Sequence, residues 1–267
     1  MKELIVRAIS GVLYVSIVIF CLFTSREWFM GLFFALAIIT LNEFLRIVKL
    51  KSIIPYLILA VLFYFLSYDV FDWNAVYLML ILSSFVCLFL MKELFRDSEI
   101  TLFGIKKFVA ATFYLIGGFI FLTLIPIQDG QYVPEVVVGF FILVWSNDSF
   151  AYLVGKNFGR KKLMERVSPK KTVEGFIGGV VGAVVAGFII FKYFEYFPLW
   201  MWIAMALIAS IMGTIGDLIQ SKLKRQAGVK DSGVLMPGHG GLYDRLDSII
   251  YSSPFIYAFI EISEYVS

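Results

Sequence analysis

The sequence predicts an all-α, polytopic transmembrane protein with about nine membrane-spanning helices and a cytosolic N-terminus. Of its 267 residues, 60% are hydrophobic and only 16% are charged, whereas soluble domains are about half apolar and a quarter charged. Apolar stretches close to the roughly 17–25 residues that cross a bilayer as a helix recur along the whole chain. Because they leave no room for a separate soluble domain, residues 1–267 are predicted to form a single integral membrane domain.

Nine apolar segments are the candidate spans. They are residues 8–24, 28–45, 53–68, 74–91, 108–126, 134–153, 173–192, 199–216 and 247–262. The first five lie within residues 1–126, and the last four lie within residues 134–267, the half that carries the polar motifs. Pro55 near the start of the third segment and Pro254 inside the ninth leave eight or ten spans as alternatives.

The distribution of Lys and Arg predicts the orientation. Cytosolic loops of membrane proteins are enriched in these residues. With nine alternating spans, all but two of the 23 Lys and Arg residues, Arg26 and Lys192, fall on the side of the N-terminus. The net charge of +3 therefore reflects topology and anionic ligands at the cytosolic face. No nucleic-acid-binding module is apparent, so nucleic acid is not an expected partner.

The sixth span contains the first candidate functional residue, Asp148. A charged residue inside a span costs on the order of 2.5–3.5 kcal/mol, so a retained one is a functional candidate. The alternative is that Asp148 and its neighbours Ser146 and Asn147 form a hydrogen-bonded cluster that joins helices.

The loop before the seventh span is predicted to bind an anion. Ser168 as N-cap and Pro169 at the first helical position predict a helix start there. This start would hold Lys170 and Lys171 beside the free amides of a helix N-terminus, which favours negative ligands. Both lysines could equally be ordinary anchors on the cytosolic side. The glycines that follow have the spacing of close helix packing: Gly175, Gly178, Gly179 and Gly182.

Asp217, Ser221 and Lys224 lie at positions i, i+4 and i+7. If the eighth span continues as a helix into the cytosol, a carboxylate, a hydroxyl and a cation therefore share one face.

A turn rich in glycine and proline leads into the ninth span. Here Gly238, Gly240 and Gly241 surround His239, the only histidine, and would let backbone amides approach a ligand closely. A lone histidine is otherwise often only a hydrogen-bonding residue.

Asp244 and Asp247 follow on one helical face, with Arg245 between them. Carboxylates this close repel one another unless a cation or a proton lies between them. Together with Asp217 and Asp148 they are predicted to hold one or two divalent ions, and Mg²⁺ suits such oxygen-rich sites because substrate phosphates complete its coordination. Carboxylates with cations suit phosphoryl or nucleotidyl transfer.

The last of these motifs resemble the phosphatidate cytidylyltransferase (CDP-diacylglycerol synthase) family. The family signature is matched by Ser221, Lys224, Arg225, Lys230, Asp231, His239, Gly240, Gly241, Asp244, Arg245 and Asp247. Gly216-Asp217-Leu218, Asn147-Asp148 and the stretch 168–175 also resemble family blocks. The resemblance is close over about the last half of the chain, whereas the first five spans are similar only in being hydrophobic.

The resemblance implies a Mg²⁺-dependent reaction of CTP with phosphatidic acid, giving CDP-diacylglycerol and pyrophosphate in bacterial phospholipid synthesis. It also implies a homodimer in the cell inner (plasma) membrane, with the active site facing the cytosol. Asp217, Ser221, Lys224, Arg225, His239, Asp244 and Arg245 would then be catalytic. Lys170, Lys171, Lys230, Gly240 and Gly241 would bind substrate, and Asp148, Asp217, Asp244 and Asp247 would hold metal.

Two other functions remain open at this point. A CTP-dependent lipid kinase of the polyprenol type resembles the same superfamily but transfers the terminal phosphate and releases CDP. A cation transporter could use Asp148 and Asp217 as an ion path. The carboxylates crowd towards one face, however, and no chain of ionisable residues crosses to the other side, which argues against transport.

Overall fold

The computed structural model describes residues 2–194, 196–235 and 240–266, and most of them are helical. The helices are α1 (Lys2–Thr24), α2 (Arg26–Ile47), α3 (Ile54–Phe63), α4 (Trp73–Phe95), α5 (Ile105–Val109), α6 (Gly117–Leu124), α7 (Pro134–Phe158), α8 (Val173–Tyr193), α9 (Leu199–Gln226) and α10 (Tyr243–Val266). A π-helical turn, Tyr64–Tyr68, extends α3, and another, Ala110–Ile116, joins α5 to α6. Helix therefore covers each of the nine predicted apolar segments, and α10 continues through Pro254.

The chain is a multi-pass membrane protein. Within the described residues, 6 helices are long and apolar enough to cross a bilayer. They are Arg26–Ile47, Trp73–Phe95, Ile105–Leu124, Pro134–Phe158, Val173–Tyr193 and Leu199–Gln226. Ile9–Thr24 and Ile54–Tyr68 are shorter apolar helices.

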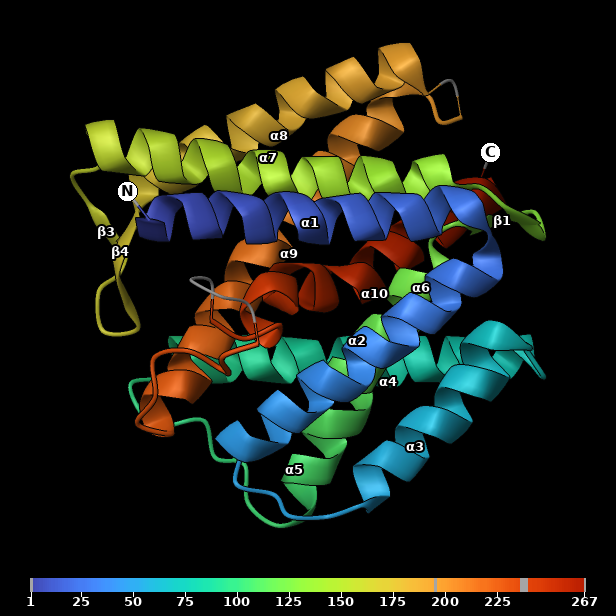
Figure 1. Ribbon diagram of the computed structural model, residues 1–267, viewed down its shortest axis with the longest axis horizontal. Helices are drawn as coiled ribbons and strands as arrows, with labels where there is room; N and C mark the ends of the chain where they lie inside the picture. Colours follow the sequence, from blue (N-terminus) through green and yellow to red (C-terminus); the bar gives the residue numbers. More distant parts are fainter. Residues whose placement is uncertain (1, 195, 236–239, 267) are drawn as a thin grey trace.

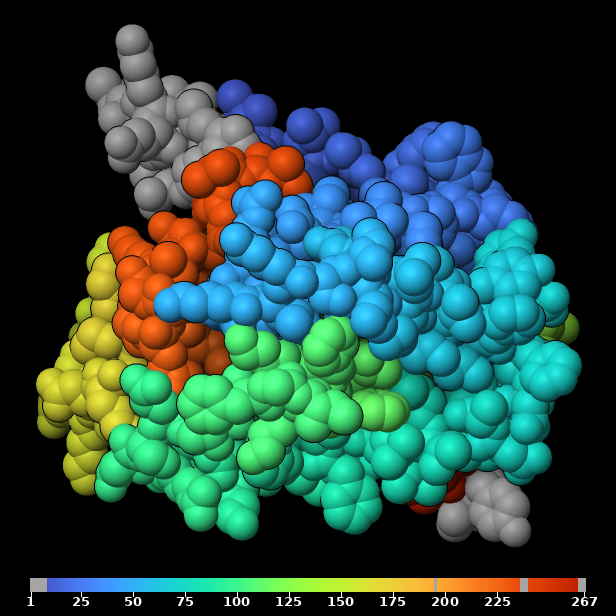
Figure 2. All heavy atoms as spheres, turned by 90° about the horizontal axis from the view of Figure 1, so that it is seen from below, coloured from blue at the N-terminus to red at the C-terminus, as the bar shows by residue number. Residues whose placement is uncertain are grey.

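Most of the helices run roughly along one direction, so the connections gather at two opposite ends (Figure 1). The start of α1, the segment between α4 and α5, the β3–β4 hairpin and the segment leading from α9 to α10 lie at one end. The β1–β2 hairpin and the C-terminus lie at the other. In the perpendicular view the hairpin and the end of α9 again lie at the same end (Figure 2). The polar motifs of the sequence are therefore brought to one end of the helices.

Helices α7 and α8 pack closely because glycines line their contact, as the glycine spacing predicts. A Cβ added at Gly179 would lie 2.7 Å from Oδ1 of Asn147, and one added at Gly175 would lie 2.8 Å from the carbonyl oxygen of Ala151. Such distances leave no space for a side chain, so the two backbones approach directly.

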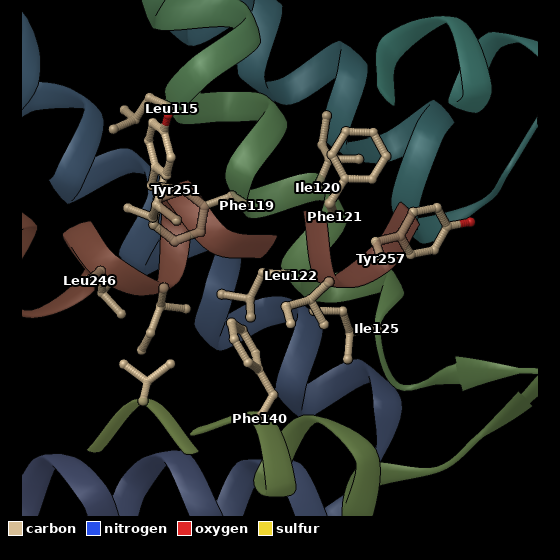
Figure 3. Close-up of a cluster of buried hydrophobic side chains, with 14 of the residues drawn as sticks. Leu115, Phe119, Ile120, Phe121, Leu122, Ile125, Phe140, Leu246, Tyr251 and Tyr257 are labelled. Carbon is tan, nitrogen blue, oxygen red and sulfur yellow. The ribbon is translucent and has the colours of Figure 1, made fainter. Parts of the chain in front are cut away.

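Helix α10 packs between the two halves of the chain, against α9 on one side and α6 on another. Figure 3 shows Leu246, Tyr251 and Tyr257 of α10 among buried side chains of the α6 region, including Phe119 and Phe121. The position of the first turn of α10 therefore depends on helices from both halves.

The structure corrects the predicted helix start at Ser168 and adds short strands to the all-α prediction. Ser168–Thr172 is strand β4, which pairs antiparallel with β3 (Lys162–Met164). Helix α8 begins at Val173, and the Thr172 hydroxyl accepts a hydrogen bond of 3.1 Å from the Gly175 amide. A second hairpin pairs β1 (Ile127–Gln128) with β2 (Gln131–Tyr132). Lys170 and Lys171 thus lie on a strand and not in the first turn of a helix.

Candidate active site

A cavity of ≈ 680 Å³ lies where α7, the β3–β4 hairpin, α8, α9 and α10 meet. Its size falls within the roughly 300–1,000 Å³ of small-molecule sites. The structure brings seven of the predicted site residues to its wall: Asp148, Lys170, Lys171, Asp217, Asp244, Arg245 and Asp247. They come from three helices and a strand, so the tertiary structure confirms that these separated motifs share one place.

Asp217 and Lys171 form an ion pair in this cavity. Both side chains are partly shielded, with 26% of Asp217 and 32% of Lys171 exposed. Burial alone would lower the pKa of Lys171, but the adjacent Asp217 carboxylate outweighs it and raises this pKa above its usual value. Lys171 is therefore a fixed positive charge beside the carboxylates.

Asp247, on α10, and Asp217, on α9, line the same cavity and interact electrostatically. Asp148, on α7, is close enough to interact electrostatically with both of them. Carboxyl groups so close together need a shared proton or a cation. Lys171 is one such cation beside Asp217, and carboxylate oxygens are also ligands that Mg²⁺ takes.

The side chains that the structure describes do not form a complete metal site. Among the side chains that the structure describes, no three His, Cys, Asp or Glu residues are gathered tightly enough to hold an ion by themselves. Mg²⁺ usually keeps waters and is completed by substrate phosphates. This arrangement fits an ion that is bound together with a phosphate ligand.

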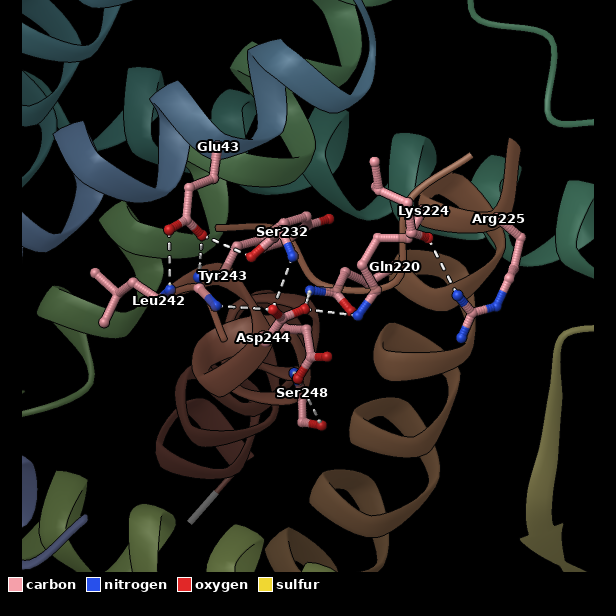
Figure 4. A network of polar contacts seen from close by, with 12 residues as sticks. Glu43, Gln220, Lys224, Arg225, Ser232, Leu242, Tyr243, Asp244 and Ser248 are labelled. Carbon is pink, nitrogen blue, oxygen red and sulfur yellow. Dashed lines mark hydrogen bonds and ion pairs between the residues drawn. The ribbon is translucent and has the colours of Figure 1, made fainter. Parts of the chain in front are cut away.

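Asp244 is engaged differently from the other carboxylates (Figure 4). Its Oδ1 accepts hydrogen bonds from Gln220 (2.8 Å) and Lys224 (2.6 Å). Its Oδ2 accepts from the amides of Ser232 (2.8 Å) and Gly241 (3.0 Å). A carboxylate offers about four lone-pair sites, so these four donors occupy Asp244. Its geometry suits holding the segment before α10 better than ligating a metal.

Helix α9 continues to Gln226, so the predicted polar residues Asp217, Ser221 and Lys224 lie on one unbroken helix. Lys224 and Ser221 are buried outside the cavity wall, and Lys224 pairs with Asp244, a residue of that wall, and also interacts electrostatically with Asp217. Arg225 does not line the large cavity that holds Asp148, Asp217 and Asp247. It donates to the Val229 carbonyl and lines a separate cavity of ≈ 170 Å³ with Arg166.

The structure describes some of the predicted site residues between α9 and α10, namely Lys230, Gly240 and Gly241. Lys230 is exposed, and Gly240 has a φ of 88°, a conformation that favours glycine. A Cβ at Gly240 would lie 2.9 Å from Oδ2 of Asp244. His239 lies outside the described residues.

Sequence reasoning missed Glu43, a buried carboxylate on α2 that contacts the segment before α10 (Figure 4). It lies within the predicted span 28–45, so the rule that drew attention to Asp148 applies to it as well. It also missed Gln220, which donates to Asp244. In the sequence Gln220 is marked only by being a polar residue on the same helix as Asp217.

Comparison with known proteins identifies the family. The sequence profile of the cytidylyltransferase family matches residues 5–263. The phosphatidate cytidylyltransferase of Bacillus subtilis (strain 168) is 36% identical over 259 residues, which cover 94% of this chain and 95% of that protein. The phosphatidate cytidylyltransferase of Staphylococcus haemolyticus is 29% identical over 262 residues, covering 94% and 96% of the two chains. These matches span both halves of the chain, and the chain therefore belongs to the cytidylyltransferase family.

Proposed function

We propose that this chain transfers the cytidylyl group of CTP to phosphatidic acid, giving CDP-diacylglycerol and pyrophosphate for phospholipid biosynthesis. The observation that carries the proposal is the ≈ 680 Å³ cavity at the polar end of membrane-spanning helices, walled by carboxylates and cations. Joining two anionic substrates requires this combination, because both must be held close together while their charges are neutralised. Relatives over nearly the full chain carry the name of this activity.

In this proposal the lipid phosphate attacks the α-phosphorus of CTP in line, and pyrophosphate leaves without a covalent intermediate. A phosphomonoester has a second pKa near 6, so at neutral pH the attacking oxygen carries no proton that a base must remove. The chain's task is to bind and orient. Lys170, Lys171 and Arg245 line the cavity, and in this proposal they hold the phosphate groups.

Asp217 and Asp247, with Asp148 beside them, are the residues that would hold Mg²⁺. When bound, this ion supplies positive charge that neutralises the phosphates and the leaving group. Asp244 and Lys224 act on the site indirectly, because their pair fixes the start of α10 against α9.

We also propose the nine-span topology with a cytosolic N-terminus and a cytosolic active site in the inner membrane. The lopsided Lys and Arg distribution supports it, as does the gathering of the N-terminus and the cavity elements at one end of the helices. A homodimer is proposed on the family resemblance, and the mass of the detergent-solubilised protein by light scattering tests it.

The test is to give the purified, detergent-solubilised protein CTP, Mg²⁺ and phosphatidic acid, and to identify the products. Pyrophosphate together with a cytidylylated lipid is the expected result. CDP together with a newly phosphorylated lipid would replace this proposal with a lipid kinase. If the folded protein forms neither set of products, both activities are refuted.

A further inference from the structure

Glu43 is a buried carboxylate in the N-terminal half of the chain, away from the motifs that line the large cavity. It lies near the end of α2, only 5% exposed, in a helix that is mostly apolar. Placing a carboxylate there without partners would cost several kcal/mol. Such a residue needs strong hydrogen-bond donors, and their identity indicates its role.

Among the described residues, Glu43 accepts hydrogen bonds from three donors, and all of them belong to the segment that ends at the first turn of α10. Its Oε1 accepts from the Leu242 amide (3.1 Å), and its Oε2 accepts from the Tyr243 amide (2.8 Å) and the Ser232 hydroxyl (2.7 Å). The Leu242 and Tyr243 amides are at the N-terminus of α10, where backbone N–H groups have no partner within the helix. Glu43 therefore caps α10 from a helix about 200 residues earlier in the chain.

Glu43 and Asp244 both bind Ser232 and backbone amides at the start of α10 (Figure 4). Asp244 accepts from the amides of Ser232 and Gly241, and Glu43 accepts from the next two amides and from the Ser232 hydroxyl. Three successive amides, 241 to 243, are thus held by two carboxylates. The backbone between Ser232 and α10 is fixed at both of its ends.

Glycines next to the Glu43 carboxylate leave room for its contact with the start of α10. A Cβ on Gly233 or Gly241 would overlap the Glu43 carboxylate. The neighbouring ring of Phe44 meets Tyr243 edge-on with centroids 6.0 Å apart, and the Tyr243 hydroxyl is 2.8 Å from that of Tyr114 in the π-helical turn. The N-terminal half therefore holds the start of α10 by both packing and hydrogen bonds.

We propose that Glu43 is a positioning residue for the reaction: it fixes the first turn of α10 and thereby aims Asp247 at the cavity. This inference rests on the proposed cytidylyltransfer for its kinetic consequence. Asp247 is one helical turn beyond the capped amides, so a shift of that turn moves its carboxylate relative to Asp217 on α9. Misplacement of a catalytic group by about 1 Å can cost on the order of 100-fold in rate.

The test compares Glu43→Gln with Glu93→Gln. Glu93 is also a buried glutamate of the N-terminal half, 3% exposed, but its side chain pairs with Arg96 and not with the segment before α10. Glutamine at 43 keeps the shape of glutamate but turns an NH₂ group towards one of the backbone amides, so a donor faces a donor. The kcat of Glu43→Gln is expected to fall by about 10- to 100-fold, with the KM for CTP little changed. Glu93→Gln should leave kcat per folded protein unchanged.

Hydrogen exchange supplies a readout that does not depend on activity. Exchange at the Leu242 and Tyr243 amides should be about tenfold faster or more in Glu43→Gln, as expected when one such hydrogen bond is lost, and unchanged in Glu93→Gln. If Glu43→Gln does not fold, Ser232→Ala removes one of the three donors and should give a smaller change of the same kind. Unchanged exchange, or a loss of activity that only follows the amount of folded protein in both Gln variants, would overturn the proposal. The exchange measurement remains decisive if the wild-type protein forms no product, so failure of the proposed function and failure of this inference are distinguishable.

Discussion

Removal of the buried Asp244–Lys224 pair should have a large effect on stability. Only 6% of the Asp244 side chain and 10% of the Lys224 side chain are exposed, and Nζ of Lys224 is 2.6 Å from Oδ1 of Asp244. In Asp244→Asn one of the two oxygens becomes an NH₂ group, which faces donors whichever way the amide is turned. Gln220 can adapt by turning its own amide, because its buried Oε1 has no hydrogen-bond partner among the described residues. Lys224 cannot adapt, so Asp244→Asn leaves a buried ammonium ion without its counter-charge.

Removing one partner of a buried ion pair costs about 3–5 kcal/mol. For proteins slightly smaller than this one, 1 kcal/mol shifts the melting midpoint by roughly 2–4 °C. Asp244→Asn should therefore lower the apparent midpoint by about 6–20 °C. Turnover should fall as well, because the segment before α10 loses an anchor.

Tryptophan fluorescence during heating of the detergent-solubilised protein measures the midpoint. Asp97→Asn is the matched control, since it makes the same chemical change in an ion pair, with Arg166, in which Asp97 is fully exposed; its midpoint should stay that of the wild type. The double variant Lys224→Met/Asp244→Asn removes both charges and should recover at least half of the loss. A midpoint of Asp244→Asn equal to that of Asp97→Asn, or a double variant less stable than Asp244→Asn, would refute the reasoning.

Three further outcomes are expected. Asp217→Asn should reduce turnover at least about 100-fold with a smaller change in midpoint than Asp244→Asn, because Asp217 lines the cavity and is a quarter exposed; full turnover at normal Mg²⁺ would contradict its role. Chelating divalent ions should abolish product formation, and added Mg²⁺ should restore it, which a titration against pyrophosphate release measures. The Lys222 ammonium donates to the carbonyls of Glu93 (2.7 Å) and Arg96 (2.9 Å) at the end of α4, so Lys222→Met should lower the melting midpoint by several degrees. Because Lys222 lies outside the large cavity, kcat per folded protein should be retained. A selective loss of kcat in Lys222→Met would show that binding the carbonyls at the end of α4 is not the main role of Lys222.

One local sequence pattern predicted the structure correctly, and another did not. The glycine spacing after residue 174 predicted direct contact of helices, and the structure confirms that a Cβ at Gly179 would strike Asn147. Ser168-Pro169 also has a local pattern, that of a helix start, but here tertiary pairing with β3 takes the segment into a hairpin. Local preferences of this kind are small, so a partner strand overrides them.

The sequence by itself determined that this chain crosses a membrane repeatedly, and it supplied the carboxylates and cations of the cavity. The reason is that a bilayer demands long apolar helices, so charged residues stand out against them. Only the tertiary structure decided how those charges are used. It pairs Asp217 with Lys171, surrounds Asp244 with four donors and places Arg225 outside the wall of the large cavity. It also brings Glu43 to the start of α10. Contacts between residues so far apart in the chain have no periodicity that a local pattern could express, and they follow only from how the helices pack.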